Sequence, residues 1–358
     1  MQLFAGNIDL FARVCYNEDD DKLMEVTMIN LDSLIDKIHA VVESHYLGNG
    51  AYARYLWQDA EESRDMGINE YGCADAMNIL YSIGRFPKGE KRELALNALL
   101  DLQNSETGLF VEKTHHHIHT TAHCTAAIEL FDEVPKYPVK AMERIFTKDG
   151  IKELLDSLAW TSNPWPQSHQ GAGAYVVGVL TGAVDLEWQD YYFGLIADAT
   201  DEKWGMSRAG TIDGGTAPVC HHLYGWFHYM FNMEYAKRPL QYPDTLVDSC
   251  IKMYDENMLG ETFGRFIGFC EIDWVYALNR ATRQTPHRFY EAKDRLRDFA
   301  GKFVSYLESL DFETDDGVND LHMLFGTVCA LAELQMALPG EIVSTRPLRL
   351  VLDRRPFI

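Results

Sequence analysis

Residues 104–130, NSETGLFVEKTHHHIHTTAHCTAAIEL, contain the pattern that decides the predicted fold. The stretch begins with an Asn-Ser-Glu-Thr-Gly turn, in which Gly108 can adopt the positive φ that such a turn needs. A polar segment with four histidines follows, and residues 121–130 are then small or apolar at close to helical spacing. Small residues around much of a helix indicate close contact on more than one side. We therefore predict a helix buried among other helices and preceded by a histidine-rich loop.

The same unit of turn, polar loop and buried helix recurs along the chain. Five further buried helices are predicted at 77–84, 175–180, 223–231, 274–278 and 323–334. With the histidine unit there are six, and their starts lie about 50 residues apart, a period typical of stacked helical repeats. Between them lie stretches that mix apolar and charged residues, as a helix with one solvated face does, at 30–43, 89–102, 139–158, 187–197, 244–254 and 286–310. This alternation predicts an all-α fold, an (α/α)6 toroid of six inner and six outer helices.

The loops indicate which face of the ring carries function. Connections from inner to outer helices are short and contain Pro or Gly, whereas those from outer to inner helices are long. Long loops on one face mark a functional face. We expect one toroid domain over 29–340, flanked by an N-terminal extension, 1–28, and a C-terminal extension, 341–358. Residues 8–14 are predicted as a strand or short helix. The C-terminal extension is predicted as a strand that caps the barrel or as part of a subunit contact, which leaves a homo-oligomer open.

Composition limits the partners. A net charge of −22 argues against nucleic acid, because phosphate must be neutralised by Lys and Arg, and it disfavours anionic membranes. The N-terminus lacks the basic and apolar regions of a signal peptide, and no apolar run is long enough to span a bilayer. The seven cysteines are an odd number and fall mostly in predicted buried helices, as in a reduced protein. We expect a cytoplasmic protein.

Two families of toroid show a resemblance in sequence. The run Leu102-Gln-Asn, Gly-Leu-Phe and Thr-Ala-His-Cys-Thr-Ala-Ala-Ile-Glu-Leu resembles one repeat of the prenyltransferases and squalene cyclases, although the cyclases' Asp-x-Asp-Asp signature is absent. Asn163-Pro-Trp and Asp213-Gly-Gly-Thr, followed by His221-His-Leu-Tyr-Gly, resemble segments of the toroidal polysaccharide lyases. That second resemblance implies that His221 or His222 is the lyase histidine, but Tyr224 and Tyr229 do not fall at the family's tyrosine spacing.

Histidines near the starts of inner helices are the leading catalytic candidates. Imidazole titrates near neutrality, and a helix N-terminus lowers its pKa and favours the neutral base. Two carboxylates, Glu271 and Asp273, begin the fifth inner helix within an apolar run, where a charge is costly unless it is paired or used. The predicted catalytic residues are His117, His119, His169, His221, His222, Glu271 and Asp273. The alternatives are that the histidines are ordinary loop or core residues and that the carboxylates form ion pairs with Arg265 or Arg280.

Aromatic side chains beside the long loops favour a sugar substrate, because their flat faces suit pyranose rings and such residues commonly line ligand sites. The predicted substrate-binding residues are Tyr71, Trp165, Trp204, Tyr224, Arg265 and Trp274. Packing between helices is the alternative for these aromatic residues. We therefore predict a carbohydrate-active enzyme, a hydrolase, lyase or epimerase, acting on a small-molecule or oligosaccharide substrate at the N-terminal ends of the inner helices.

No cofactor is predicted. Neither Cys-x-x-Cys nor His-Glu-x-x-His spacing occurs, so we expect no tightly bound structural zinc. The pair Cys220-His221 nevertheless resembles the Cys-His pair of the lanthionine cyclases, a toroid family with zinc at its centre, and His119 and His123 lie four residues apart. A zinc-dependent or isoprenoid-type toroid enzyme therefore stays open. So does a non-catalytic repeat scaffold, which would have an open groove and scattered histidines.

Overall fold

The computed structural model describes residues 28–59 and 63–358, and this part of the chain is mostly helical. The prediction of an all-α fold is thereby confirmed. The segment 8–14 and nearly all of the predicted N-terminal extension lie outside the described residues. Within the described residues, no helix is both long and apolar enough to cross a bilayer.

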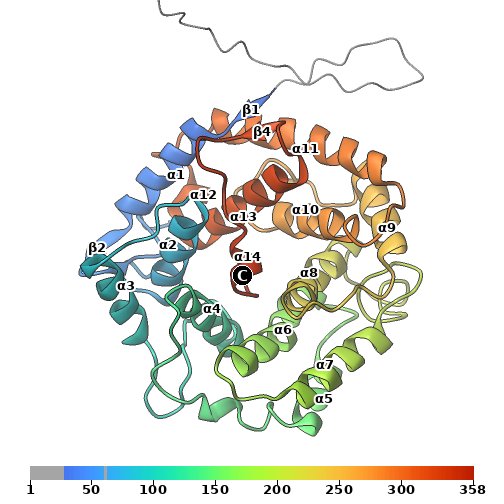
Figure 1. Cartoon of the computed structure of the whole chain (residues 1–358), viewed down its shortest axis with the longest axis horizontal. Helices are drawn as coiled ribbons and strands as arrows, with labels where there is room; N and C mark the ends of the chain where they lie inside the picture. The colour runs from blue at the N-terminus through green and yellow to red at the C-terminus, as the bar shows by residue number, and fades with distance from the viewer. Residues whose placement is uncertain (1–27, 60–62) are drawn as a thin grey trace, which may run out of the picture.

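Six largely buried helices occupy the positions predicted for the inner helices. They are α2 (Glu70–Ser82), α4 (His117–Glu129), α6 (Pro164–Leu180), α8 (Val219–Tyr235), α10 (Cys270–Ala281) and α13 (Leu321–Ala337). Each packs against the next in chain order, and α13 packs against α2, so the contacts form a closed cycle. Figure 1 shows these helices arranged in a circle.

Six more helices lie outside this circle in Figure 1, and each falls at a predicted outer helix. They are α1 (Asp32–Ser44), α3 (Glu90–Leu100), α5 (Lys148–Ser157), α7 (Leu186–Ala199), α9 (Pro243–Asp255) and α11 (Phe289–Ser309). The predicted helix 139–158 is divided into a short 3-10 helix, Lys140–Met142, and α5. The division follows from Thr147, whose hydroxyl accepts a hydrogen bond from the Gly150 N–H at 3.0 Å and so caps a new helix.

Several inner helices begin earlier than predicted, because the polar residues before each apolar run are helical too. The helix α4 starts at His117 instead of 121, and Nδ1 of His116 caps it by accepting a hydrogen bond from the Ile118 N–H. The helix α6 starts at Pro164, a residue favoured in the first turn because its missing N–H is not needed there. Histidines expected on loops therefore stand on rigid helix starts.

The C-terminal segment returns to the middle of the circle. The short strand β4 (Ile342–Val343) pairs in parallel with β1 (Ile29–Asn30), so a strand does form, and the chain then continues to a short helix, α14 (Val351–Arg354). The N–H of Arg349 donates to the Ser82 carbonyl at the end of α2. Figure 1 places α14 and the end of the chain inside the ring, where Phe357 is fully buried.

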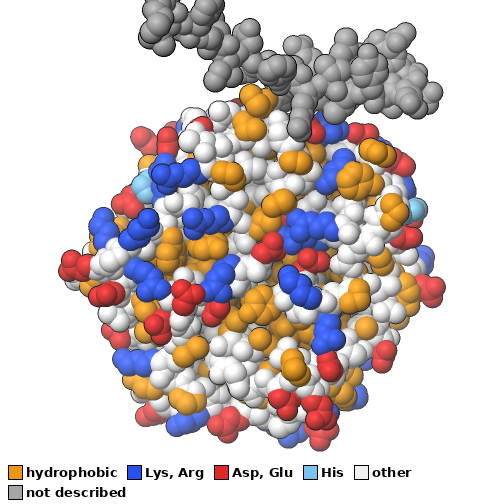
Figure 2. Space-filling view, viewed as in Figure 1, with side chains coloured by type: hydrophobic (Ala, Val, Ile, Leu, Met, Phe, Trp, Pro, Cys, Tyr) orange, Lys and Arg blue, Asp and Glu red, His pale blue; other side chains and the backbone are white. Residues whose placement is uncertain are grey.

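Three minor elements complete the described structure. The strands β2 (Tyr46–Gly48) and β3 (Ala51–Tyr52) pair in antiparallel fashion, and α12 (Asp316–Asn319) precedes α13. The face seen in Figure 2 carries acidic side chains mostly around its margin, with hydrophobic and basic side chains nearer its centre. The six cysteines of the described part are free, and five of them are buried.

Candidate functional site

A buried carboxylate joins three inner helices at the centre of the candidate site. Asp75 on α2 accepts a hydrogen bond of 2.7 Å from Nε2 of His123 on α4 and one of 2.9 Å from Nδ1 of His322 on α13. Asp75 and His123 are fully buried, and His322 nearly so. Burial alone would raise the pKa of Asp75, but the two imidazoles hold it well below its usual range. Asp75 therefore stays ionised and fixes the orientation of both rings.

Tyr71 connects this carboxylate group to further histidines. The side chain of Asn69 accepts hydrogen bonds at the start of α2, including one of 2.8 Å from the Tyr71 N–H, and so caps the helix. The Tyr71 hydroxyl lies 2.6 Å from Nδ1 of His119, within hydrogen-bond distance. Its ring lies 4.4 Å from that of His322 and 4.7 Å from that of His115, centre to centre. Tyr71 is thus enclosed by histidines.

A row of imidazoles continues from Tyr71 across the ring. The ring centres of His119 and His169 are 4.3 Å apart, and those of His169 and His228 are also 4.3 Å apart. The hydroxyl of Ser168 lies 3.0 Å from Nδ1 of His228 and holds that ring in place. Helices α4, α6 and α8 supply one histidine each. We use the name axial cluster for the set of Asp75, Tyr71, His119, His123, His169, His228 and His322.

The histidines of the row are neutral at pH 7. Burial lowers the pKa of His119 and of His169 well below the usual value, and their histidine neighbours lower it further. Burial also lowers the pKa of His228 to about 3 and that of His322 to about 4. A neutral imidazole has one nitrogen lone pair free, so each ring can accept a proton or bind a metal ion.

Several ring nitrogens of the cluster have no protein partner. Among the described residues, no hydrogen bond reaches either nitrogen of His169 or the Nε2 atoms of His119, His228 and His322. None of these atoms is among the fully enclosed polar atoms, so each keeps contact with solvent-sized space, and His169 as a whole is only half-buried. These nitrogens are therefore available to a ligand.

An arginine fixes the loop that leads into α4. The guanidinium of Arg54 donates two hydrogen bonds of 2.8 Å to Asp320 and one of 2.8 Å to Thr114 Oγ1. Asp320 in turn caps α13 by accepting from the His322 N–H. The chain beside Arg54 lies so close to α2 that a Cβ at Gly72 would come within 2.4 Å of the Ala53 carbonyl carbon. Only glycine fits there, and this close approach places Arg54 over the Tyr71 ring.

The C-terminal segment reaches the axial cluster from the inside of the ring. The ring of Phe357 lies 5.1 Å from that of His119, and Arg355 is fully buried over Phe325. Arg355 donates to the Phe357 carbonyl, but its Nε and Nη2 atoms have no hydrogen-bond partner among the residues described. Burial lowers the pKa of Arg355 to about 10, so it remains charged at pH 7. Asp75 is close enough to attract this charge.

Of the residues predicted from sequence, the structure brings Tyr71, His119 and His169 into this cluster. A second group forms around Trp165, whose ring centre is 4.9 Å from that of Tyr224 and 5.7 Å from that of His221. Among the described residues, no ring contact joins this second group to the axial cluster.

The other predicted catalytic residues lie apart from the cluster. His117 is exposed and its ring lies tilted against that of His116, and His222 is buried with Nδ1 2.9 Å from the Ser207 hydroxyl. Glu271 accepts from the Gly264 N–H at 2.8 Å, and Asp273 is buried with no hydrogen bond to either oxygen from the residues that the structure describes. The alternative ion pairs of these two carboxylates with Arg265 or Arg280 do not occur in the structure; Arg280 pairs with Glu333 instead.

The remaining predicted binding residues have local contacts of their own. Tyr224 donates to the Leu259 carbonyl, and Trp274 is buried with Nε1 bonded to the Cys250 carbonyl. Trp204 is half-buried beside Asp213, and Arg265 is exposed. None of these contacts involves the axial cluster.

Sequence reasoning did not select Asp75, His123, His228 and His322 for the site. Asp75 did carry a signal, since a lone carboxylate in a small, apolar helix needs a partner. Its partners lie 48 and 247 residues away along the chain, and no spacing rule connects them.

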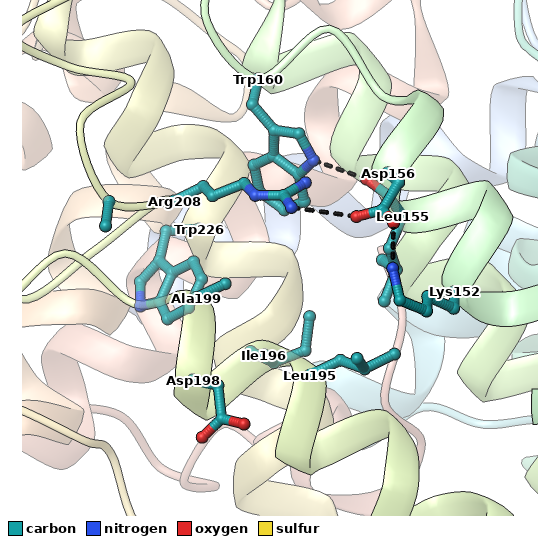
Figure 3. A pocket seen from close by; sticks show the side chains of 11 residues that line it. Lys152, Leu155, Asp156, Trp160, Leu195, Ile196, Asp198, Ala199, Arg208 and Trp226 are labelled. Atoms are coloured by element: carbon teal, nitrogen blue, oxygen red, sulfur yellow. Dashed lines mark hydrogen bonds and ion pairs between the residues drawn. The ribbon is translucent and has the colours of Figure 1, made fainter.

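A separate cavity of about 350 Å³ opens between α5 and α7. Figure 3 shows Trp160 and Trp226 in its wall, with Lys152 and Arg208 both bonded to Asp156. Because these charged groups satisfy one another, the cavity offers few free polar atoms. It shares no residue with the axial cluster.

Comparison of the chain with protein-family models, with curated proteins and with solved structures found no match.

Proposed function

We propose that the chain is an (α/α)6-toroid enzyme whose active site is the axial cluster. The observation that carries this proposal is the convergence of five histidines and one carboxylate from five inner helices on one place. Buried polar groups of this kind cost stability unless they are paired or used. A repeat scaffold would have no need to gather them, so the convergence favours an enzyme over a binding scaffold.

His169 is the best-placed general base or acid. It stands on the second turn of α6, it is half-buried, and neither of its nitrogens is hydrogen-bonded to a residue in 28–59 or 63–358. His119 lies beside it, and the Tyr71 hydroxyl holds Nδ1 of that ring. Two neighbouring neutral imidazoles can remove a proton from one position of a substrate and return it at another. Proton transfer of this kind serves a lyase or an epimerase as well as a hydrolase.

A carbohydrate is the substrate class that we propose. The support is the group of Trp165 at the start of α6 with His221 and Tyr224 at the start of α8, in which Trp165 and His221 are both half-buried and can contact a sugar ring. The substrate would be a small molecule or an oligosaccharide that reaches the cluster from the N-terminal ends of the inner helices.

An oligosaccharide thermal-shift screen tests the proposal. We expect at least one sugar to raise the melting temperature of the wild-type protein, and the shift to shrink in His169→Ala while it persists in His117→Ala, an exposed histidine outside the cluster. A product formed from that sugar, detected by mass spectrometry, would establish the reaction. If no sugar binds, or if His169→Ala binds as wild type does, the proposal fails.

A further inference from the structure

We propose that Asp75, His123 and His322 form a binding site for one divalent transition-metal ion, with zinc as the best fit. The three donors come from α2, α4 and α13, and their ligand atoms all lie within 4.8 Å of one another. The proposal that the ion binds does not depend on the proposed function, whereas a role of the ion in catalysis does.

The distances suit a small ion after a slight opening of the group. The carboxylate oxygens of Asp75 lie 2.7 Å from Nε2 of His123 and 2.9 Å from Nδ1 of His322. Zinc bonds imidazole nitrogen and carboxylate oxygen at about 2.0–2.2 Å, so ligand atoms around a tetrahedral ion are roughly 3.3 Å apart. The two carboxylate–imidazole distances therefore have to open by roughly 0.5 Å for coordination, and the proton of each coordinating nitrogen moves to the other nitrogen of its ring.

The donor set selects the kind of ion. Two imidazoles and one carboxylate suit zinc and other late first-row metals, whereas magnesium and calcium prefer oxygen donors alone. Three protein ligands leave a coordination position for water or substrate, as in catalytic zinc sites. Tyr71 and His119 lie beside the three ligands, since both rings contact that of His322.

Surrounding contacts hold the ligands in place, as metal sites require. Asn78 donates to Asp75 at 3.4 Å, and Asp320, itself fixed by Arg54, accepts from the N–H of His322. One nearby charge works against a cation, because the Arg355 guanidinium interacts with Asp75. We therefore expect an exchangeable ion that a chelator removes, which differs from the tightly bound structural zinc that the sequence argued against.

Isothermal titration of zinc into chelator-treated, tag-free protein tests the site. We expect about one equivalent to bind to wild type and to His222→Gln, whose buried histidine lies outside the cluster, and this binding to be lost in His123→Gln and His322→Gln. The variant His117→Gln controls for zinc held by exposed histidines. Absence of binding to wild type, or full binding to folded His123→Gln and His322→Gln, overturns the proposal.

If the variants His123→Gln and His322→Gln do not fold, X-ray absorption spectroscopy of the zinc-loaded wild type tests the site instead, because it identifies the atoms that bind the zinc. We expect two imidazole ligands with oxygen donors in the remaining positions, and sulfur ligands or an all-oxygen shell would contradict the site. If zinc binds but no sugar is turned over, the metal site stands and the proposed function fails. If sugar is turned over by protein that binds no zinc, the proposed function stands and the metal site fails.

Discussion

Glu271 is enclosed at the start of α10, where Oε1 accepts a hydrogen bond from the Gly264 N–H and Oε2 has no partner within the described part of the chain. Burial raises its pKa to about 7. The unfolded chain releases this proton near pH 4.5, the usual value, while the folded chain keeps it until about pH 7. The contribution of Glu271 to the free energy of unfolding is therefore fully present below pH 4.5 and is lost as the pH rises towards 7.

Glu271→Gln should remove this pH dependence. The amide keeps an acceptor for Gly264 and never ionises, so we expect it to be close to wild type at pH 4.5 and more stable at pH 8, by up to roughly 3 kcal/mol at about 1.4 kcal/mol per pKa unit. Denaturant unfolding at both pH values measures the difference. Glu261→Gln, at an exposed glutamate, is the control and should change little. An advantage for Glu271→Gln that is equal at both pH values would contradict the raised pKa.

The packing of α10 against α13 includes a buried ion pair. Arg280 donates to Glu333 at 2.7 and 2.8 Å, and Asn279 donates to the same carboxylate at 2.6 Å. Both charged side chains are 2% exposed, so neither can turn to water when the other is removed. The pair therefore contributes to stability mainly through the cost of leaving one partner alone.

Glu333→Ala should cost about 3–5 kcal/mol of unfolding free energy, because Arg280 would remain buried with weaker partners. Urea unfolding followed by circular dichroism gives the value. Glu153→Ala removes the exposed partner of Arg144 and should cost no more than about 1 kcal/mol. Replacement of both Arg280 and Glu333 by apolar residues should recover much of the loss. A small effect of Glu333→Ala alone would show that the pair is not enclosed.

The helices themselves could be predicted well from sequence, whereas the site could be predicted only in part. Apolar periodicity and loop length identify α4 and α6, but they place the helix starts too late, because His117 and Pro164 are residue types common in loops. Which side chains meet depends on how each helix is rotated about its axis, which no local pattern determines. Glu271 and Asp75 both lie in inner helices, yet only Asp75 reaches the cluster.

At the scale of the whole molecule, the C-terminal segment fills the middle of the ring. Arg354 donates to the Glu129 carbonyl at the end of α4, and Asp353 pairs with Arg280 of α10. Phe357 then packs between His119 and Phe231, at ring-centre distances of 5.1 and 5.8 Å. One short segment thus connects opposite sides of the ring and supports the axial cluster from within.

Phe357→Ala should destabilise the protein by about 3–5 kcal/mol, the usual cost of truncating a fully buried phenylalanine, because the substitution leaves a cavity beside His119 and Phe231. Guanidinium unfolding measures the loss. Phe289→Ala, at the 38% exposed first residue of α11, is the matched control and should cost far less. Equal effects of the two substitutions would mean that the segment does not occupy the ring.

The rate of a His169→Gln variant on a sugar that the wild type converts is the measurement that tests the axial cluster most directly. If His169 transfers a proton in the reaction, kcat should fall by roughly a hundredfold or more, the scale of general acid–base catalysis, while the melting temperature stays nearly unchanged. His117→Gln, on the same face but exposed, should retain the wild-type rate. A His169→Gln enzyme with wild-type kcat, or one whose loss of rate follows only from unfolding, would contradict an active site at the ring axis.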